Sequence, residues 1–277
     1  MNKTIRILSV FSLTALAAVS ATAPVFASDP SDPQNAIGLG GSPAATCARV
    51  NLCTGGAISN GEAYAGPGLL WRTNFLNNTL ELVDLANGCA VIKSCPAPGA
   101  SSPSELTFLN GVLYHYDFGT GLIYAIDPTT CQVLASCDPP GDDLAEGLTN
   151  DGQALWRSDS VELIKFTPPS AAGPGCQVLA RCPLPPGDSA DGLTMCQGNL
   201  IMLGYSGTVY SIDPNTCTVT GSCDLNAGAS GNGVTSNRIN TIYADDVSGD
   251  LDQIDVGCHI PLPAKASTWG GVKAIYR

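Results

Sequence analysis

Short apolar segments of five to seven residues are separated along most of the chain by turns rich in Gly, Pro, Asn and Asp. In several of them apolar and polar residues alternate, as in TVYSIDP at residues 208–214. This alternation is the period of a strand with one buried face. Val, Ile, Tyr and Trp, which favour strands, occupy many of these positions. Almost no stretch has the roughly 3.6-residue period of an amphipathic helix, so the pattern predicts an all-β protein.

The predicted strands belong to a repeated unit. Residues 126–141 read IDPTTCQVLASCDPPG, and residues 212–228 read IDPNTCTVTGSCDLNAG. The first cysteine of the unit recurs every 41 to 45 residues, and a second follows six positions later except in the last copy. The first cysteines are Cys47, Cys89, Cys131, Cys176, Cys217 and Cys258, and the second ones are Cys53, Cys95, Cys137, Cys182 and Cys223.

Each unit contains four short predicted strands: a Gly-Leu-Thr-like segment, an aromatic segment, a segment that leads into Ile-Asp-Pro, and the cysteine segment. Four short strands in roughly 40 residues are typical of a β-propeller blade. The segment before Cys53 supplies only the last two strands of a unit, and the C-terminal TWGGVKAIYR supplies only the first two. We therefore predict a six-bladed β-propeller of four-stranded blades, whose last blade is closed by N-terminal and C-terminal strands.

Residues 1–27 have the features of a secretory signal peptide, because Lys3 and Arg6 precede an apolar stretch that ends in a small-residue cleavage pattern. The apolar stretch is too short for a membrane helix, and no other apolar run is long enough to span a bilayer. We expect a secreted or periplasmic protein, with a short linker at residues 28–35 and one propeller domain at residues 36–277.

The chain is acidic, with a formal net charge of −12 from 24 acidic and 12 basic residues. Such a protein repels nucleic acid and anionic lipid surfaces. Only 13% of the residues are charged, and 31 Gly and 20 Pro indicate a folded chain rich in turns rather than a charged disordered one. We expect a monomer without a nucleic-acid partner, whose partner is an unidentified small ligand or protein.

The chain has 12 cysteines: the eleven of the repeats and Cys196. In an oxidising compartment we expect them to form disulfides. Pairing within each copy is the simplest scheme, and it leaves Cys196 and Cys258 either paired with each other or free. However, a straight strand from Cys131 to Cys137 would separate its ends by roughly 20 Å, and a disulfide requires Cα atoms within about 7 Å. Either the outer segment curls back, or the bridges join other elements.

The first strand of each blade lines the central channel of a propeller, and its start lies at one mouth. The Gly-Leu-Thr alignment places Glu146, Asp191 and Asn232 at this position in three units. Gly61 and Ser104 occupy it in the first two units, where Glu62 and Glu105 come one residue later. Carboxylates and an amide that converge could hold a hard cation such as Ca²⁺, which would polarise an ester or lactone carbonyl. We expect Glu105 and Glu146 to contact a ligand at this mouth.

The sequence also predicts the positions of three further side chains. Trp269 comes just before the last predicted blade, where its indole would face the channel mouth and stack on a ligand. Trp156 lies in an aromatic second strand and is expected in the core between blades. His115 lies within another second strand, where a packed histidine is a simpler interpretation than a catalytic base.

The segments EGLTNDGQALWRSDS, at residues 146–160, and DGLTMCQGNLIMLGYSGTVYSIDP, at residues 191–214, resemble repeats of the NHL and gluconolactonase-like propeller superfamily. Its units run Gly-Leu-x, a turn, an aromatic strand and then Ile-Asp-Pro. The resemblance implies a lactonase-like site in which Glu, Asn and Asp surround a divalent cation, and the matching residues are Glu62, Asn232 and Asp191.

The sequence offers few residues for nucleophilic catalysis. It has two histidines and contains neither a Gly-x-Ser-x-Gly nor a His-Glu-x-x-His motif. The first interpretation is therefore a secreted propeller that acts as a ligand-binding or protein-interaction module. The alternative is a divalent-cation-dependent hydrolase or lyase with its site at the acidic mouth of the channel.

Overall fold

The computed structural model describes residues 46–54, 56, 58–99, 102–141, 146–225, 233–245, 249–254, 258 and 260. All of these residues belong to one compact unit of the chain. The predicted signal peptide and linker, together with Asn232, His259 and Trp269, lie outside the described residues. The described helical turn η2 (Leu85–Asn87) is far too short to cross a bilayer.

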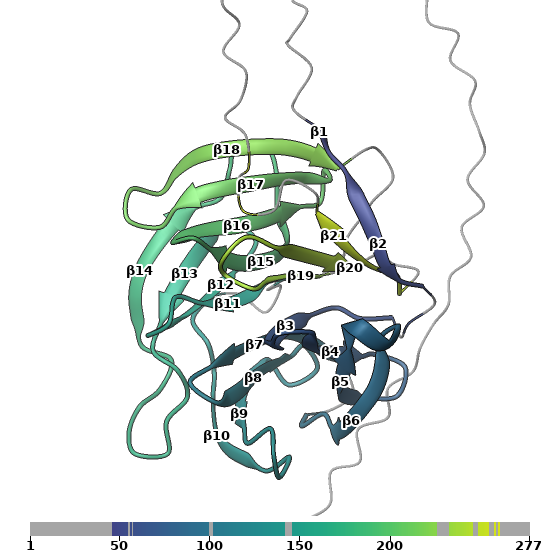
Figure 1. The fold of residues 1–277 in the computed structure, drawn as a ribbon. Coiled ribbons are helices and arrows are strands. Elements are labelled where there is room, and N and C mark those ends of the chain that lie inside the picture. Colours follow the sequence, from purple (N-terminus) through teal and green to yellow (C-terminus); the bar gives the residue numbers. More distant parts are fainter. Residues whose placement is uncertain are drawn as a thin grey trace, which may run out of the picture. The chain divides into compact units, whose positions relative to one another are not determined.

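The strands form five sheets, each with four antiparallel strands, and strands consecutive in sequence pair except where N-terminal strands join the last two sheets (Figure 1). The first sheet contains β3 (Glu62–Gly66), β4 (Leu69–Asn74), β5 (Thr79–Asp84) and β6 (Ala90–Pro96). The second contains β7 (Pro103–Leu109), β8 (Val112–Asp117), β9 (Leu122–Ile126) and β10 (Val133–Cys137). The third contains β11 (Leu148–Asn150), β12 (Leu155–Ser158), β13 (Glu162–Phe166) and β14 (Val178–Pro183).

The last two sheets include strands from the start of the described chain. The fourth contains β15 (Ala190–Cys196), β16 (Asn199–Gly204), β17 (Thr208–Asp213) and β18 (Thr218–Leu225), and β1 (Thr46–Cys47) pairs in parallel with β18. The fifth contains β19 (Gly233–Ser236), β20 (Ile242–Asp245), β21 (Leu251–Ile254) and, antiparallel to β21, β2 (Arg49–Cys53).

The innermost strands of neighbouring sheets contact one another in a closed ring. β3 contacts β7, β7 contacts β11, β11 contacts β15, β15 contacts β19, and β19 returns to β3. Figure 1 shows the five sheets around a common centre, with these strands nearest to it. The described residues therefore form a β-propeller of five blades.

The prediction of six blades is wrong for the described residues. The prediction assigned two strands of a separate blade to the N-terminal segment. In the structure β2 completes the fifth blade, and β1 lies on the outer edge of the fourth. Cys258 was counted as the start of a sixth cysteine strand, but it is bonded to Cys196 at the end of β15. Only the tertiary pairing of β2 with β21 distinguishes these two ways of closing the ring.

Apolar side chains fill the space between the blades, as expected from the second-strand positions. Trp71 of the first blade packs in one cluster with Leu106 and Ile126 of the second. Trp156 of the third blade packs in another with Leu193 of the fourth. His115 is fully buried in β8, which agrees with a packed histidine. Each blade thus covers the apolar face of its neighbour, and burial of this surface stabilises the ring.

Each disulfide joins cysteines of two different copies rather than the two cysteines of one copy. The second cysteine of each unit bonds to the first cysteine of the next, and the last bond returns to the start of the ring: Cys53–Cys89, Cys95–Cys131, Cys137–Cys176, Cys182–Cys217 and Cys223–Cys47. Their Cα atoms are 5.2–6.0 Å apart. Pairing within a copy was wrong because the outer strands are extended, and the alternative that the bridges join other elements is confirmed.

Together, these five disulfides and the outer-strand segments between them form a closed covalent loop around the circumference, which we call the hoop. The first cysteine of four units has a left-handed backbone, with φ of 57° at Cys89 and Cys217, 60° at Cys176 and 61° at Cys131. This conformation costs a non-glycine residue about 1 kcal/mol. The turn before the cysteine provides a hydrogen-bond acceptor for its backbone N–H: the Cys131 N–H donates to Asp127 O at 2.8 Å.

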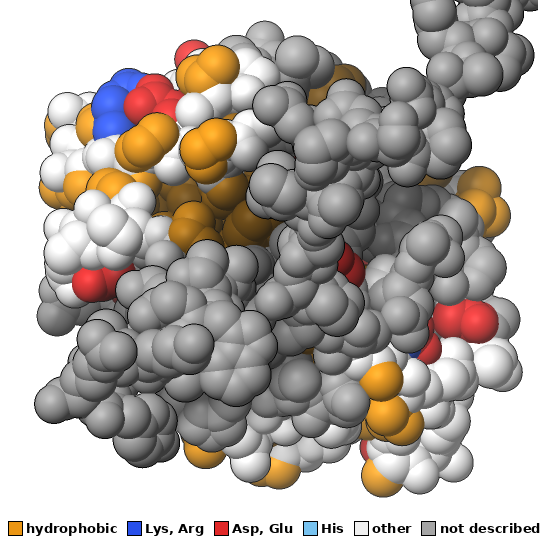
Figure 2. Space-filling view, turned by 90° about the horizontal axis from the view of Figure 1, so that it is seen from above, with side chains coloured by type: hydrophobic (Ala, Val, Ile, Leu, Met, Phe, Trp, Pro, Cys, Tyr) orange, Lys and Arg blue, Asp and Glu red, His pale blue; other side chains and the backbone are white. Residues whose placement is uncertain are grey.

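In the first three blades the hoop segment also carries a β-bulge with an exposed aliphatic residue. Ile92, Leu134 and Leu179 occupy these bulges in the first three blades and are 54%, 49% and 53% exposed. Figure 2 shows hydrophobic side chains gathered on one part of the molecular surface, beside a group of basic and acidic side chains. Bulges interrupt the regular pairing of an edge strand and so oppose edge-to-edge aggregation.

The hoop makes a prediction about stability. Considered as isolated loops, the Cys47–Cys223 bond spans 176 residues and the Cys95–Cys131 bond spans 36. Loop-closure entropy alone would then make the first worth about 1.4 kcal/mol more. In the hoop each bond closes the same covalent circle, so we expect the double variants C47S/C223S and C95S/C131S to lose similar amounts, about 2–4 kcal/mol each.

The measurement is guanidinium unfolding without reductant. The double variant C196S/C258S, which leaves the hoop closed, is the matched control for the loss of one disulfide. A cost for C47S/C223S well above that for C95S/C131S would contradict the hoop.

Candidate functional site

A pocket of about 390 Å³ opens where the innermost strands of the blades begin. Several blades contribute to it, with carboxyl groups below and aromatic rings at the rim. Its lining residues are Asn60, Phe75, Ser102, Ser104, Glu105, Phe118, Glu146, Asp191 and Tyr205. The structure therefore brings together three of the acidic residues that the repeat alignment placed at one mouth of the channel.

Glu105 lies in β7 and is only 4% exposed. Burial raises the pKa of its carboxyl group well above the ordinary value, and the negative charges of Glu62, Asp191 and Glu146 add to this increase. A backbone hydrogen bond from Leu148 opposes the shift. Burial among these carboxyl groups therefore favours the protonated form of Glu105, which is the form that can donate a proton within the pocket.

Asp191 lies near the start of β15 and is 6% exposed. Burial and the neighbouring charges of Glu146 and Asp188 raise its pKa to about 7. Its Oδ2 atom is buried without a hydrogen-bond partner among the described residues. An unpaired buried carboxylate oxygen is costly, so this atom is the strongest sign that the pocket receives a group able to pair with it.

Glu146 completes the acidic wall just before β11. Burial also raises the pKa of its carboxyl group, while a hydrogen bond from the Tyr205 hydroxyl opposes the shift. The same burial and the carboxylate of Glu146 raise the pKa of Tyr205. Tyr205 therefore remains a neutral hydrogen-bond donor at the rim.

Glu62 belongs to a separate pair at the junction of the first and fifth blades. Glu62 and Asp245 are each 3% exposed. Burial raises the pKa of both, and the charge of Glu62 raises that of Asp245 further. Repulsion between two neighbouring buried carboxyl groups disfavours the ionisation of both at once. Ser59 Oγ donates to Glu62 Oε1 at 2.6 Å.

Asp245 is a functional candidate that the repeat alignment missed. It ends a second strand, whereas the alignment considered only the starts of first strands. Gly233 makes room for the pair, since a Cβ atom there would collide with Glu62 Oε2. The glycine of the Asn-Gly-Val-Thr segment was the only sequence signal of this crowding.

The aromatic rim was also missed. Phe75, Phe118 and Tyr205 are 41%, 46% and 52% exposed and lie in the turns between second and third strands. These turns return to the same end of the ring as the starts of the first strands. An aromatic residue at the start of each of these short turns was the available signal.

The opposite end of the channel is hydroxyl-lined and narrow. The threonines of the Gly-Leu-Thr-like segments meet at a cavity of about 30 Å³, with Arg238 beside them. Arg238 Nη2 donates to Asn150 O at 2.8 Å and also to Asn150 Oδ1. This link joins the fifth blade to the third, and Asn150 Nδ2 continues it to Thr107 Oγ1 at 2.8 Å.

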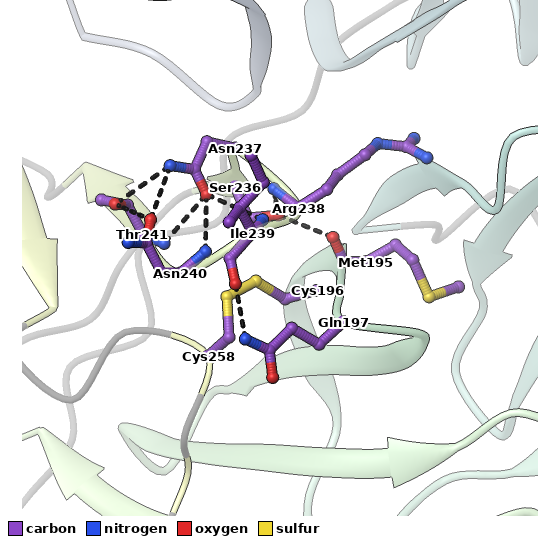
Figure 3. The surroundings of a disulfide bond; sticks show 10 residues. All are labelled: Met195, Cys196, Gln197, Ser236, Asn237, Arg238, Ile239, Asn240, Thr241 and Cys258. Carbon is purple, nitrogen blue, oxygen red and sulfur yellow. Dashed lines mark hydrogen bonds between the residues drawn. A yellow bond between two sulfur atoms is a disulfide. The ribbon is translucent and has the colours of Figure 1, made fainter.

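The backbone around Arg238 is held firmly. Figure 3 shows the Cys196–Cys258 disulfide beside this turn, with the Arg238 side chain extending away from it. Ser236 Oγ donates to Met195 O at 2.6 Å, and Gln197 Nε2 donates to Ile239 O at 2.6 Å. A ligand of the acidic pocket therefore has its access from the opposite, acidic mouth.

A metal centre was expected from Glu62, Asp191 and Asn232. Glu62 faces Asp245 in the pair described above, Asp191 lines the pocket, and Asn232 lies outside the described residues. Within the described part of the chain, no three His, Cys, Asp or Glu side chains are grouped so that they could hold a metal ion.

The chain matches no protein-family model, and no curated protein matches it. Among solved structures it is similar to glutaminyl cyclase from Myxococcus xanthus, with a TM-score of 0.61 and 17% identity over 78% of this chain and 98% of that chain. A streptogramin B lyase gives a TM-score of 0.44 and 16% identity over 69% of this chain and 62% of that one. Virginiamycin B lyase from Staphylococcus aureus gives a TM-score of 0.46 and 15% identity over 69% of this chain and 64% of that one.

At 17% identity the likeness to the glutaminyl cyclase supports the fold and nothing finer. The comparisons do not confirm membership of the NHL and gluconolactonase-like superfamily, which the repeat segments resemble.

The carboxyl groups predict how stability changes with pH. The folded state holds the Asp191 proton up to about pH 7, whereas the ordinary pKa of the group is 3.8. Its contribution is therefore fully present below about pH 4 and is lost as the pH rises through about 7. We expect Tm to fall between pH 5 and pH 8, by about 2–4 °C for each kcal/mol lost.

The substitution D191N removes this titration and should flatten the profile. Calorimetry of wild type, D191N and the surface control D138N over this range measures the difference. A D191N profile as steep as that of wild type would contradict the assignment.

Proposed function

We propose that the protein is a ligand-binding module whose acidic pocket binds the ammonium group of an organic ligand. The observation that carries this proposal is the buried Asp191 carboxylate, whose Oδ2 atom lies unpaired in a pocket that it shares with Glu105 and Glu146. An ammonium group supplies hydrogen-bond donors and a positive charge, and so relieves the repulsion between these carboxyl groups.

The rim favours an organic cation over a bare metal ion. Phe75, Phe118 and Tyr205 surround the pocket with aromatic surface. Such rings attract alkylammonium groups through their negative faces and bury the attached carbon atoms. A hard metal ion prefers a shell of oxygen ligands, which the aromatic rim does not supply.

Binding should depend on pH because the ammonium group pairs with ionised carboxylates. Below its pKa of about 7, Asp191 is protonated and must release its proton when a cation binds. We therefore expect the affinity for n-butylammonium, measured by calorimetry, to rise by about tenfold from pH 6 to pH 8. Proton release should appear as a dependence of the heat on the buffer.

Matched variants separate the pocket from general charge attraction. D191N should weaken n-butylammonium binding by at least about tenfold, while D138N removes the same charge from an exposed position and should leave binding unchanged. Neutral n-butanol tests the contribution of charge. Equal affinities for D191N and D138N, or for the amine and the alcohol, would refute the proposal.

A second candidate function is acid–base catalysis, and one observation favours it. Burial raises the pKa of Glu105 and favours its protonated form, while Asp191, in the same pocket, has a pKa of about 7. A proton donor and a proton acceptor in one site are the requirements of general acid–base chemistry.

The glutaminyl cyclase that shares the fold suggests one reaction to examine. In cyclisation of an amino-terminal glutamine, the uncharged α-amino nitrogen bonds to the side-chain amide carbon and loses a proton to Asp191. Glu105 protonates the amide nitrogen, the carbon–nitrogen bond breaks, and ammonia leaves. The assay measures ammonia released from a peptide that begins with glutamine. The E105Q variant should abolish this release. Saturable binding of the peptide without release of ammonia would exclude the cyclisation and favour the ligand-binding module.

The divalent-cation-dependent hydrolase or lyase remains an alternative proposal, supported by the acidic residues that the resemblance matched. It requires Ca²⁺ or another divalent cation to raise Tm and to support ester or lactone hydrolysis. Asn232 would then contribute a ligand, so N232A should abolish both effects.

A further inference from the structure

Apolar side chains extend beyond the pocket along the same end of the propeller. Leu76 is 72% exposed and Val161 is 66% exposed, and both lie in turns between second and third strands. With the three rim aromatics they form what we call the apolar collar: Phe75, Leu76, Phe118, Val161 and Tyr205. The collar draws on four successive blades, so it borders the pocket on several sides.

Large exposed apolar side chains grouped around a polar pocket are characteristic of an interaction surface. A free small amine would fill only the pocket and leave Leu76 and Val161 in water. Neither residue lines the pocket. The collar therefore fits a ligand whose cationic group is attached to a larger, partly apolar molecule.

The pocket changes from apolar at its rim to acidic at its buried end, and this order indicates which cationic group fits it. The rim is aromatic and exposed, whereas the carboxyl groups of Glu105 and Asp191 are 4% and 6% exposed. A lysine side chain has the same order, with a four-carbon apolar stem and an ammonium tip. The free amino terminus of a polypeptide instead places its ammonium next to polar peptide groups, which the aromatic rim would desolvate without pairing.

We propose that the pocket receives a lysine side chain of a polypeptide partner, and that apolar residues flanking this lysine pack on the collar. The inference rests on the proposed binding of an ammonium group and specifies its source. Charge complementarity supports it, since the chain carries a net charge of −12 and the pocket gathers three carboxyl groups. Because the Arg238–Asn150 hydrogen bond crosses the other end of the channel, the lysine side chain would enter from the end that carries the collar.

The test measures binding of short peptides that are acetylated at the N-terminus and amidated at the C-terminus. The central probe has one lysine flanked by leucines, and n-butylammonium is the reference for the side chain alone. We expect the peptide to bind at least about tenfold more tightly than n-butylammonium. Norleucine in place of lysine keeps the stem without the charge and should abolish binding.

Collar variants show whether the flanking residues contribute. L76S and V161S should each weaken the leucine-flanked peptide by about threefold or more and leave n-butylammonium binding unchanged. I92S, on the outer strand β6, removes a similarly exposed aliphatic side chain far along the blade from the rim and is the matched control. Circular dichroism and Tm verify that each variant is folded.

The outcomes separate this inference from the proposed function. If n-butylammonium binds but the peptide binds no more tightly, or if the collar variants have no effect, the lysine partner is wrong and the ammonium pocket stands. If a peptide with a free amino terminus and no lysine binds more tightly than the lysine peptide, the source of the ammonium is wrong. If neither the amine nor any peptide binds, both proposals fail.

Discussion

The contact between β3 and β19 closes the ring, and the remaining architecture depends on it. A single four-stranded blade has two apolar faces and cannot bury both without neighbours on each side. Without this closure the first and fifth blades would each expose a face that the cluster of Leu70, Val83 and Leu251 now covers. The N-terminal segment then secures the last two blades: β2 pairs with β21 in the fifth, and β1 pairs with β18 in the fourth, where the Cys47–Cys223 disulfide holds it. The chain thus uses its earliest described residues to secure its last blades.

Closure also builds the candidate site. Because the innermost strands all start at the same end, it gathers carboxyl groups that are about 40 residues apart in the sequence. Burying these groups without basic partners raises their pKa values and costs stability. Proteins tolerate such local conflicts mainly where function requires them. The packing between blades and the hoop offset this cost.

The acidic residues serve two different purposes according to their position. Glu62 and Asp245 are buried side by side at the joint of the first and fifth blades, where burial raises the pKa of both. Glu105 and Asp191 face the pocket, where burial raises the pKa of Glu105 well above its ordinary value and that of Asp191 to about 7. Binding of a cation requires ionised carboxylates, whereas acid–base catalysis requires one group of each kind. The fold itself does not decide between these functions, because propellers support many.

The sequence by itself determined the local structure. The alternation of apolar residues identified the strands, the recurring cysteines identified the blade, and the Gly-Leu-Thr alignment placed Glu105, Glu146 and Asp191 at one mouth. Each of these features depends on contacts within about one repeat, so it leaves a period or a motif in the chain. Even the objection to pairing within a copy followed from the length of an extended strand.

Only the tertiary structure decided the number of blades, the partners of the cysteines, the pairing of Glu62 with Asp245, and the aromatic rim. All four depend on how the ends of the ring meet and on which turns then lie side by side. Residues such as Cys47 and Cys223 are 176 positions apart, and no local pattern distinguishes a cysteine that begins a new blade from one that returns to the first. The physical reason is that ring closure is a long-range contact, whose energy comes from surfaces that exist only after the blades have formed.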